Sequence, residues 1–260
     1  MTAAQRSRAG LVGFLAGLSG GLFGVGGGII MVPMLTAFYG LTQHQAHGTS
    51  LAAIGATAVA GLAVYAWHGQ VWWSAAAVMA VTSMLTARLG ARLATRTNKH
   101  RLAKIFAVFL LLVAIRLLWK APTGTAPVLT GWPAIASLLA LGGGVGLLAG
   151  FMGVGGGILA VPALTLLFGF SQQAAQGTSL ALILVSAPIG ALEHHRHGNV
   201  AMRLLPTIAV GALIGAPLAS QVAQHLPQAV LARGFALFLA ANAVQTWLRA
   251  TRAEKLAPTP

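Results

Sequence analysis

One glycine-rich stretch occurs twice in this chain and constrains the fold of the whole sequence. Residues 24–33 read GVGGGIIMVP and residues 153–162 read GVGGGILAVP, so the two copies lie 129 positions apart. The same offset relates the Gly-Thr-Ser-Leu-Ala run at 48–52 to the identical run at 177–181. The chain is therefore one unit that is used twice.

The composition indicates a protein that lies in a lipid bilayer. Apolar residues make up 57% of the 260 residues, charged residues make up 7%, and only two side chains are acidic. Such a chain cannot cover a soluble surface with polar groups. The net charge of +14 comes mainly from Lys and Arg at the ends of apolar runs, where they act as topology signals and do not indicate nucleic-acid binding. Their excess over acidic residues favours a small anionic partner.

Four apolar segments recur in each half of the chain. They cover residues 10–39, 49–66, 71–91 and 102–119 in the first half, and 134–168, 178–192, 200–222 and 231–248 in the second. A membrane-spanning helix needs about 20 residues, so the first segment of each half is too long for one simple span. Each glycine in a helix interior costs roughly 1 kcal/mol relative to alanine. We therefore expect both first segments to break at their three consecutive glycines.

The positive-inside rule predicts how these segments cross the bilayer. With Arg6 and Arg8 in the cytoplasm, eight single crossings would place the basic cluster at 92–104 outside. If each broken segment instead enters and returns on one side, that cluster and the basic C-terminal tail lie inside. Each half then crosses three times, so the halves insert with opposite orientation, as in many transporters.

The predicted fold class is an all-α polytopic membrane protein of two inverted-topology repeats. Each repeat has a Gly-broken re-entrant hairpin segment plus three transmembrane helices. The first repeat covers residues 10–120 and the second covers residues 134–250. Residues 121–133 are rich in Pro and Gly and form the predicted linker, and residues 251–260 form a tail.

The two glycine breaks predict a polar site at the interface between the repeats, because lipid tolerates irregular backbone only inside protein or beside water. Helices that start near Ile29 and Ile158 would point free N–H groups at the turns, where small oxyanions bind. The hydroxyls of two Thr-Ser pairs at expected helix starts would add donors or serve only as N-caps. The predicted substrate-binding residues are Gly24, Gly26, Gly27, Gly28, Thr49, Ser50, Gly153, Gly155, Gly156, Gly157, Thr178 and Ser179.

The glycines upstream of each turn favour a different role, which is close packing between membrane helices. They are Gly13, Gly17, Gly20, Gly21 and, at the edge of the turn, Gly24 in the first half, and Gly142, Gly143, Gly144, Gly146 and Gly150 in the second. A Gly20→Ala change is accordingly expected to be milder than a substitution in the turn. The pair His44 and His47, and its counterpart Gln173 and Gln176, are interpreted as ordinary loop residues.

A histidine-rich run gives a competing signal. Glu193 lies at the edge of an apolar segment and is the one carboxylate placed to carry protons near a span. The histidine-rich run therefore leaves a second function possible, namely a proton-coupled or metal-cation carrier that uses Glu193, His194, His195 and His197. An intramembrane enzyme or a structural subunit is the other alternative. An enzyme would need paired acid and base groups within the spans, which this sequence lacks, and we expect neither enzymatic activity, a metal nor a cofactor.

The paired motifs resemble a known family. Two Gly-x-Gly-Gly-Gly-x-x-x-Val-Pro motifs, each followed by Gly-Thr-Ser-Leu, are similar to the sulfite exporter TauE/SafE family of bacterial membrane permeases. The resemblance covers nearly the whole chain. It implies a multi-pass transporter of the bacterial inner membrane whose substrate is a small sulfur-containing or organic anion, such as sulfite or an organosulfonate. It also draws attention to Pro33, Pro162, Gly48 and Gly177 within the motifs.

Overall fold

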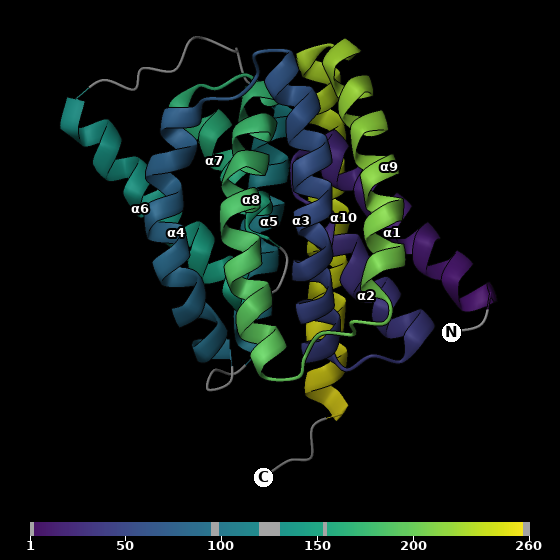
Figure 1. Ribbon diagram of the computed structural model, residues 1–260. Coiled ribbons are helices and arrows are strands. Elements are labelled where there is room, and N and C mark those ends of the chain that lie inside the picture. The colour runs from purple at the N-terminus through teal and green to yellow at the C-terminus, as the bar shows by residue number, and fades with distance from the viewer. Residues whose placement is uncertain (1–2, 95–98, 120–130, 153–154, 257–260) are drawn as a thin grey trace.

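The computed structural model describes residues 3–94, 99–119, 131–152 and 155–256, and in these ranges helices are joined by short turns (Figure 1). The first half contains α1 (Ala3–Phe23), α2 (Gly28–Tyr39), α3 (Gln43–Trp67), α4 (Trp73–Ala94) and α5 (Lys99–Trp119). The second half contains α6 (Gly131–Met152), α7 (Gly157–Phe168), α8 (Gln172–Arg196), α9 (Leu205–His225) and α10 (Gln228–Leu256). The predicted all-α polytopic fold is confirmed.

Five of the described helices are long and apolar enough to cross a membrane, namely α3, α6, α8, α9 and α10. We also expected α4 and α5 to span. They are 22 and 21 residues long, but basic residues such as Arg88 and Arg116 lower their mean hydropathy. Large apolar side chains on the outside of the bundle are well exposed, including Leu85 at 67% and Leu237 at 62%. Such a surface suits contact with lipid.

The helix breaks expected at the glycines are confirmed in both halves. Helix α1 ends before Gly24, and the chain turns there because Gly24, Gly26 and Gly27 take φ values of 69°, 77° and 84°, which glycine adopts without steric cost. In the second half Gly155 and Gly156 have φ values of 81° and 73°. Gly153 lies outside the described residues. The prolines of the two motifs fall inside α2 and α7 and do not end them.

Helices α3 and α8 begin earlier than the sequence suggested, at Gln43 and Gln172 rather than near 49 and 178. The reason is side-chain capping. Thr42 Oγ1 accepts a hydrogen bond from the N–H of Gln45 at 3.3 Å, and Gln45 completes a capping box. Ser171 caps α8 in the same way through the N–H of Ala174.

The helices of one half pack mainly against those of the other. Helix α1 packs along α9, and its counterpart α6 packs along α4, while α3 meets α8 and α5 meets α10. The first two pairs approach so closely that a Cβ at Gly13 would lie 2.0 Å from the Ile208 carbonyl oxygen. A Cβ at Gly142 would lie 2.2 Å from the Met79 carbonyl oxygen. The predicted glycine packing seams therefore join the two halves.

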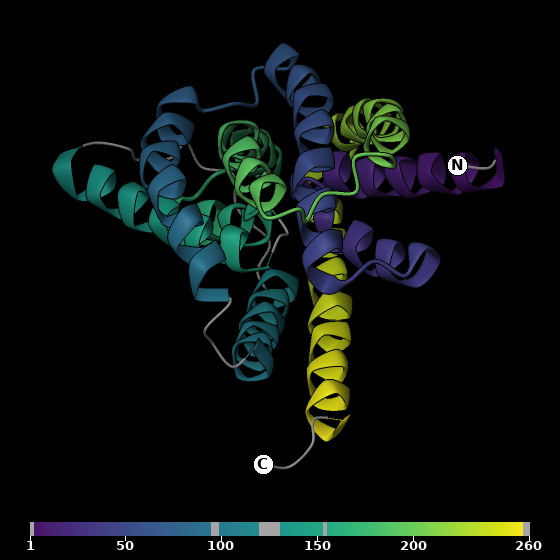
Figure 2. The ribbon, with the colours of Figure 1, turned by 60° about the horizontal axis from the view of Figure 1, so that its bottom comes forward.

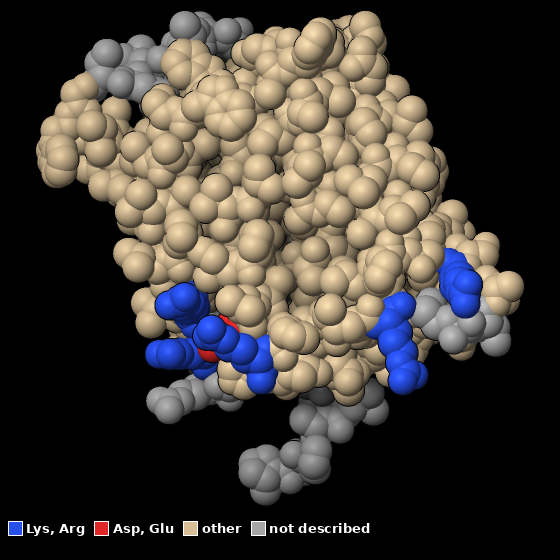
Figure 3. Space-filling view, viewed as in Figure 1, with Lys and Arg blue, Asp and Glu red and all other residues tan. Residues whose placement is uncertain are grey.

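The two halves run in opposite directions through the molecule. In Figure 1, α1 and α3 begin at the lower side, whereas α6 and α8 begin at the upper side. Helices α4 and α8 both end at the lower side. The Lys and Arg side chains visible in the same view lie along the lower edge (Figure 3). Figure 2 shows α1 and α2 on one side of the central α3 and α8, with α6 on the other.

The predicted linker (121–133) and tail (251–260) each overlap a helix of the structure. Helix α6 begins at Gly131, inside the stretch 121–133, and residues 120–130 lie outside the described residues. Helix α10 continues to Leu256 and so enters the stretch 251–260.

Candidate functional site

The two glycine turns meet in the middle of the molecule. A Cβ placed on Gly157 would lie 2.7 Å from both the carbonyl oxygen of Gly24 and the Cα atom of Val25. The residues from 24 to 28 and from 155 to 158 are all buried. Ile54 of α3 and its equivalent Ile183 of α8, both fully buried, pack against the turns. The turns of the two repeats therefore form one buried crossing between α3 and α8.

Two helices start at this crossing without a side-chain cap. The N-cap residues are Gly27 for α2 and Gly156 for α7, and neither helix start receives a side-chain hydrogen bond. The N–H groups of Ile30 and Met31 bond back to the Gly27 carbonyl oxygen at 3.2 and 3.1 Å. Among the described residues, the N–H groups of Gly28 and Ile29 have no backbone acceptor. The positive ends of two helix dipoles are thus directed to the crossing.

The turn glycines are required by packing as well as by conformation. A Cβ at Gly27 would lie 2.1 Å from the Ala16 carbonyl oxygen, and a Cβ at Gly24 would lie 2.5 Å from the Cα atom of Gln176. The expectation that Gly20→Ala is milder than a substitution in the turn stays a prediction, although Gly20 is itself closely packed. A Cβ at Gly20 would lie 2.7 Å from the Gly26 carbonyl carbon, so Gly20 supports the turn directly.

The four hydroxyls of the Gly-Thr-Ser runs have two different roles. None is an N-cap, because α3 and α8 begin at Gln43 and Gln172. Thr49 Oγ1 accepts from the N–H of Ala201 at 2.9 Å, and Thr178 Oγ1 accepts from the N–H of Trp72 at 3.1 Å. Both threonines therefore tie their helix to the loop of the opposite half. These bonds hold the scaffold, and the expected role of Thr49 and Thr178 in substrate binding stays a prediction.

The serines of the same runs are both fully buried but differ in their hydrogen bonds. Ser179 Oγ donates to the Gly24 carbonyl oxygen at 2.8 Å. Ser50, its equivalent in α3, is fully buried, and its Oγ has no hydrogen-bond partner. Ser179 thus supports the first turn, while the hydroxyl of Ser50 has a proton that it can donate to a ligand.

A second equivalent pair of hydroxyls, which the sequence reading missed, is also unpaired. Thr57 in α3 and Ser186 in α8 are at least 97% buried, and their hydroxyls have no partner. The Thr57 Cγ2 methyl would lie 2.6 Å from a Cβ on Gly20, close under the first turn. An unsatisfied buried polar group costs about 1–3 kcal/mol. Buried hydroxyls without a partner are uncommon, and here they recur at matching positions of the two halves.

Gln176 was also missed, because its position before Gly177 suggested a loop. It lies in the second turn of α8 and is fully buried. Its Oε1 is 2.9 Å from the hydroxyl of Tyr65, which is also 2.9 Å from the Gly21 carbonyl oxygen. The spacing of Gln172, Gln176 and Ser179 on one helical face was the available sequence signal.

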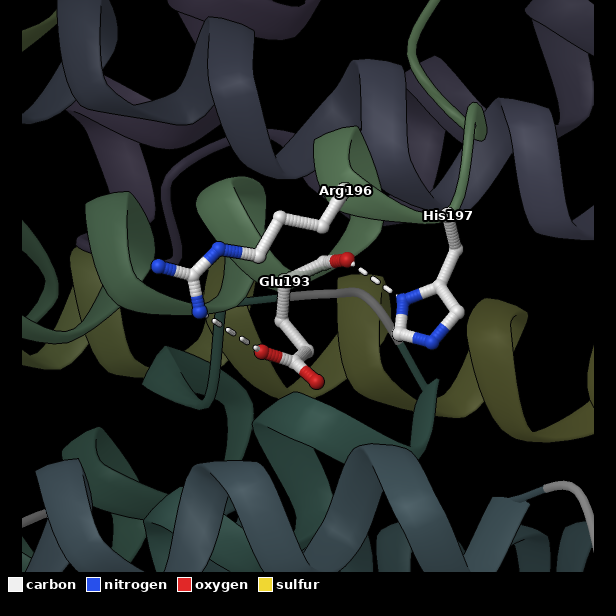
Figure 4. A network of polar contacts seen from close by, with 3 residues as sticks. All are labelled: Glu193, Arg196 and His197. Atoms are coloured by element: carbon white, nitrogen blue, oxygen red, sulfur yellow. Dashed lines mark hydrogen bonds and ion pairs between the residues drawn. The ribbon is translucent and has the colours of Figure 1, made fainter.

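The histidine-rich run lies away from the crossing. The carboxylate of Glu193 pairs with Arg196 at 3.9 Å, and His197 Nδ1 lies 2.8 Å from the Glu193 carbonyl oxygen (Figure 4). Ten residues separate Ile183 from Glu193, which is about 15 Å along a helix. No three His, Asp or Glu side chains among the described residues are placed to hold a metal ion. His194, His195 and His197 therefore do not form a metal site with Glu193 in this structure.

Comparison with known proteins agrees with the motifs. The family model for the sulfite exporter TauE/SafE matches residues 2–117 and 138–259. A "Probable membrane transporter protein" of Xylella fastidiosa (strain 9a5c) is 34% identical over 242 residues, which cover 90% of each chain. The "Probable membrane transporter protein YunE" of Bacillus subtilis (strain 168) is 30% identical over 231 residues, 81% of this chain and 84% of the relative. The chain belongs to the sulfite exporter TauE/SafE family of membrane transporters.

Proposed function

We propose that the protein is a secondary transporter of the bacterial inner membrane that carries a small anion, such as sulfite, an organosulfonate or a related organic anion. One observation carries the proposal. Two helix starts without side-chain caps, one from each half, meet at a buried crossing beside unpaired hydroxyls. Helix starts of this kind bind oxyanions through backbone N–H groups.

The chemistry of the crossing suits release as well as binding. Backbone N–H groups and the hydroxyls of Ser50 and Thr57 offer partial charges only, so an anion held there dissociates more readily than one paired with Arg. The turns are buried, and substrate access therefore requires the surrounding helices to move. The tight backbone contacts of α1 with α9 and of α6 with α4 make each pair a rigid unit. We infer that these pairs rock against α3 and α8.

The proposal is tested by flux measurements with purified protein in liposomes. Sulfite, organosulfonates, sulfate and carboxylates should be offered as a panel, with a metal cation as the comparison. We expect saturable flux of at least one small sulfur-containing anion and none of the cation. Transport of the cation alone would contradict the proposal.

Gly155→Ala is expected to weaken anion binding while leaving the protein folded. The residue has a φ of 81°, and a Cβ there would meet the Ile54 side chain only at ordinary contact distance, 3.4 Å. The added methyl group occupies the approach to the backbone, and alanine at positive φ costs about 1–2 kcal/mol. We expect the affinity for the transported anion, measured by isothermal titration calorimetry, to fall about tenfold, which corresponds to ~1.4 kcal/mol.

Gly143→Ala is the control, since a Cβ there has no neighbour nearer than 3.8 Å. Equal anion affinities of the Gly155→Ala and Gly143→Ala proteins would contradict the assignment of the glycine turns as the anion-binding site.

Proton coupling through Glu193 is a second hypothesis with its own test. The Glu193 side chain is 21% exposed and paired with Arg196 in the last turn of α8, the helix that ends at the lower side in Figure 1. Because Glu193 is paired and lies away from the crossing, we expect the Glu193→Gln protein to transport the anion at the wild-type rate with an unchanged pH profile. A lost pH dependence with retained flux would instead identify Glu193 as the proton carrier.

A further inference from the structure

One face of α8 carries a row of buried polar side chains. Gln172, Gln176 and Ser179 are spaced four and three residues apart, so they lie on the same side of the helix. All three are fully buried. Gln172 stands at the beginning of α8, on the upper side in Figure 1. Ser179 reaches the Gly24 carbonyl oxygen at 2.8 Å. The row thus runs from the upper side of the molecule to the first glycine turn.

Three of the four side-chain amide atoms of Gln172 and Gln176 lack hydrogen-bond partners. Both Nε2 and Oε1 of Gln172 are unpaired, as is Nε2 of Gln176. Tyr65 has one hydroxyl proton, which can be given either to the Gly21 carbonyl oxygen or to Gln176 Oε1. Exchanging the amide N and O of Gln176 lets its nitrogen donate to Tyr65 but leaves its oxygen unpaired. In either orientation part of the Gln176 amide stays unsatisfied.

The equivalence of the two halves does not explain why these amides are buried. The equivalent positions in α3 are Gln43, which is exposed, and His47, which is partly buried. Gln173, the neighbour of Gln172, shows what a structural glutamine does here, because its Nε2 donates to the Leu226 carbonyl oxygen at 3.2 Å. A buried amide without such a partner is better explained by a ligand that uses it.

We propose that Gln172, Gln176 and Tyr65 form a second station for the transported anion, between the upper side of the molecule and the first glycine turn. The inference rests on the proposed anion transport. Each amide offers two N–H donors and Tyr65 offers one O–H, so an oxyanion can be held there without a fixed charge. A Cβ on Gly24 would lie 2.7 Å from the Gln176 Cβ atom, so an anion released by Gln176 is next to the turn.

The test compares glutamine-to-methionine changes, which keep side-chain length and remove the donors. Gln172→Met and Gln176→Met are combined in the full chain and reconstituted in liposomes, with Gln173→Met as the matched control. Sulfite and one organosulfonate are the probes. We expect the double variant to transport at most one tenth as fast as the wild type, with an equal or higher melting temperature. The control should transport normally and melt at a lower temperature, because it loses the bond to Leu226.

The opposite pattern would overturn the inference. If the double variant transports at the wild-type rate, or slows only in proportion to a loss of folded protein, the two amides have no part in transport. This result would leave the proposed function intact. Failure of the wild type to transport any anion of the panel would instead remove the proposed function, and the second station with it.

Discussion

Gly27→Ala is expected to yield little or no folded protein in the membrane. A Cβ at this position would lie 2.1 Å from the carbonyl oxygen of Ala16 and 2.7 Å from its carbonyl carbon. These are backbone atoms of α1, so no side chain can turn aside to relieve the contact. The φ of 84° adds about 1–2 kcal/mol of strain for any L-residue with a Cβ. Overpacking of this kind costs a further 1–3 kcal/mol or so, which approaches the whole stability of a marginal protein.

The measurement is the yield of monodisperse protein after detergent extraction, together with its melting temperature. Gly55→Ala is the matched control, because nothing lies within 4 Å of a Cβ at Gly55 in the middle of α3. Alanine there should preserve or raise the melting temperature, since it favours helix by up to about 1 kcal/mol over glycine. A well-folded Gly27→Ala protein that melts with the wild type would show that α1 and the turn do not pack as described.

The expected severity at Gly27 changes how the glycine turns should be probed. A side chain at Gly27 or Gly156 would also block the approach of an anion to the backbone of the turns. At Gly156 a Cβ would lie 2.5 Å from a methyl group of Val145 and 3.1 Å from its carbonyl oxygen. Substitutions at these two sites therefore test folding first. Gly155 separates binding from folding, because only a side-chain end of Ile54 approaches it at 3.4 Å.

The breaks and the equivalence of the halves were predictable because they depend on local sequence. Three adjacent glycines disfavour a helix wherever they occur, and the pairs Gly40 with Gly169 and Gly69 with Gly198 repeat both the spacing and the positive φ. The starts of α3 and α8 were also open to prediction. Thr42 followed by Gln45 is a capping-box pattern. The predicted start of the helix was instead placed at residue 49, where the apolar run begins.

The partners of the site residues were not predictable, because they come from the other half of the chain. Thr49 bonds to Ala201, and Ser179 bonds to Gly24. No local signal distinguishes a hydroxyl that holds a loop from one that supports a turn. Gln176 was misjudged for a related reason. A glutamine near a helix start is usually exposed, and here the close approach of Gly24 buries it.

Single cysteines at Trp67 and Arg203 are expected to react from opposite sides of the membrane. Trp67 ends α3 at the upper side of Figure 1 and is 89% exposed. Arg203 is exposed in the connection between α8 and α9, which lies at the lower side. By the positive-inside rule, the basic side chains visible at the lower side in Figure 3 predict that this side faces the cytoplasm. The chain has no cysteine of its own, so each introduced thiol gives an unambiguous signal.

An impermeant thiol reagent applied to intact cells should label Trp67→Cys and leave Arg203→Cys unlabelled, and inverted vesicles should give the reverse. The experiment separates the two models of the glycine-broken segments. If every apolar segment crossed once, the ends of the second segment of each half, near 67 and near 203, would both face the cytoplasm. If α1 with α2, and α6 with α7, each enter and leave on one side, the two positions must face opposite sides, because one half is inverted relative to the other. Labelling of both cysteines from the same side would therefore disprove the re-entrant hairpins, and with them a substrate site built from two opposed helix starts.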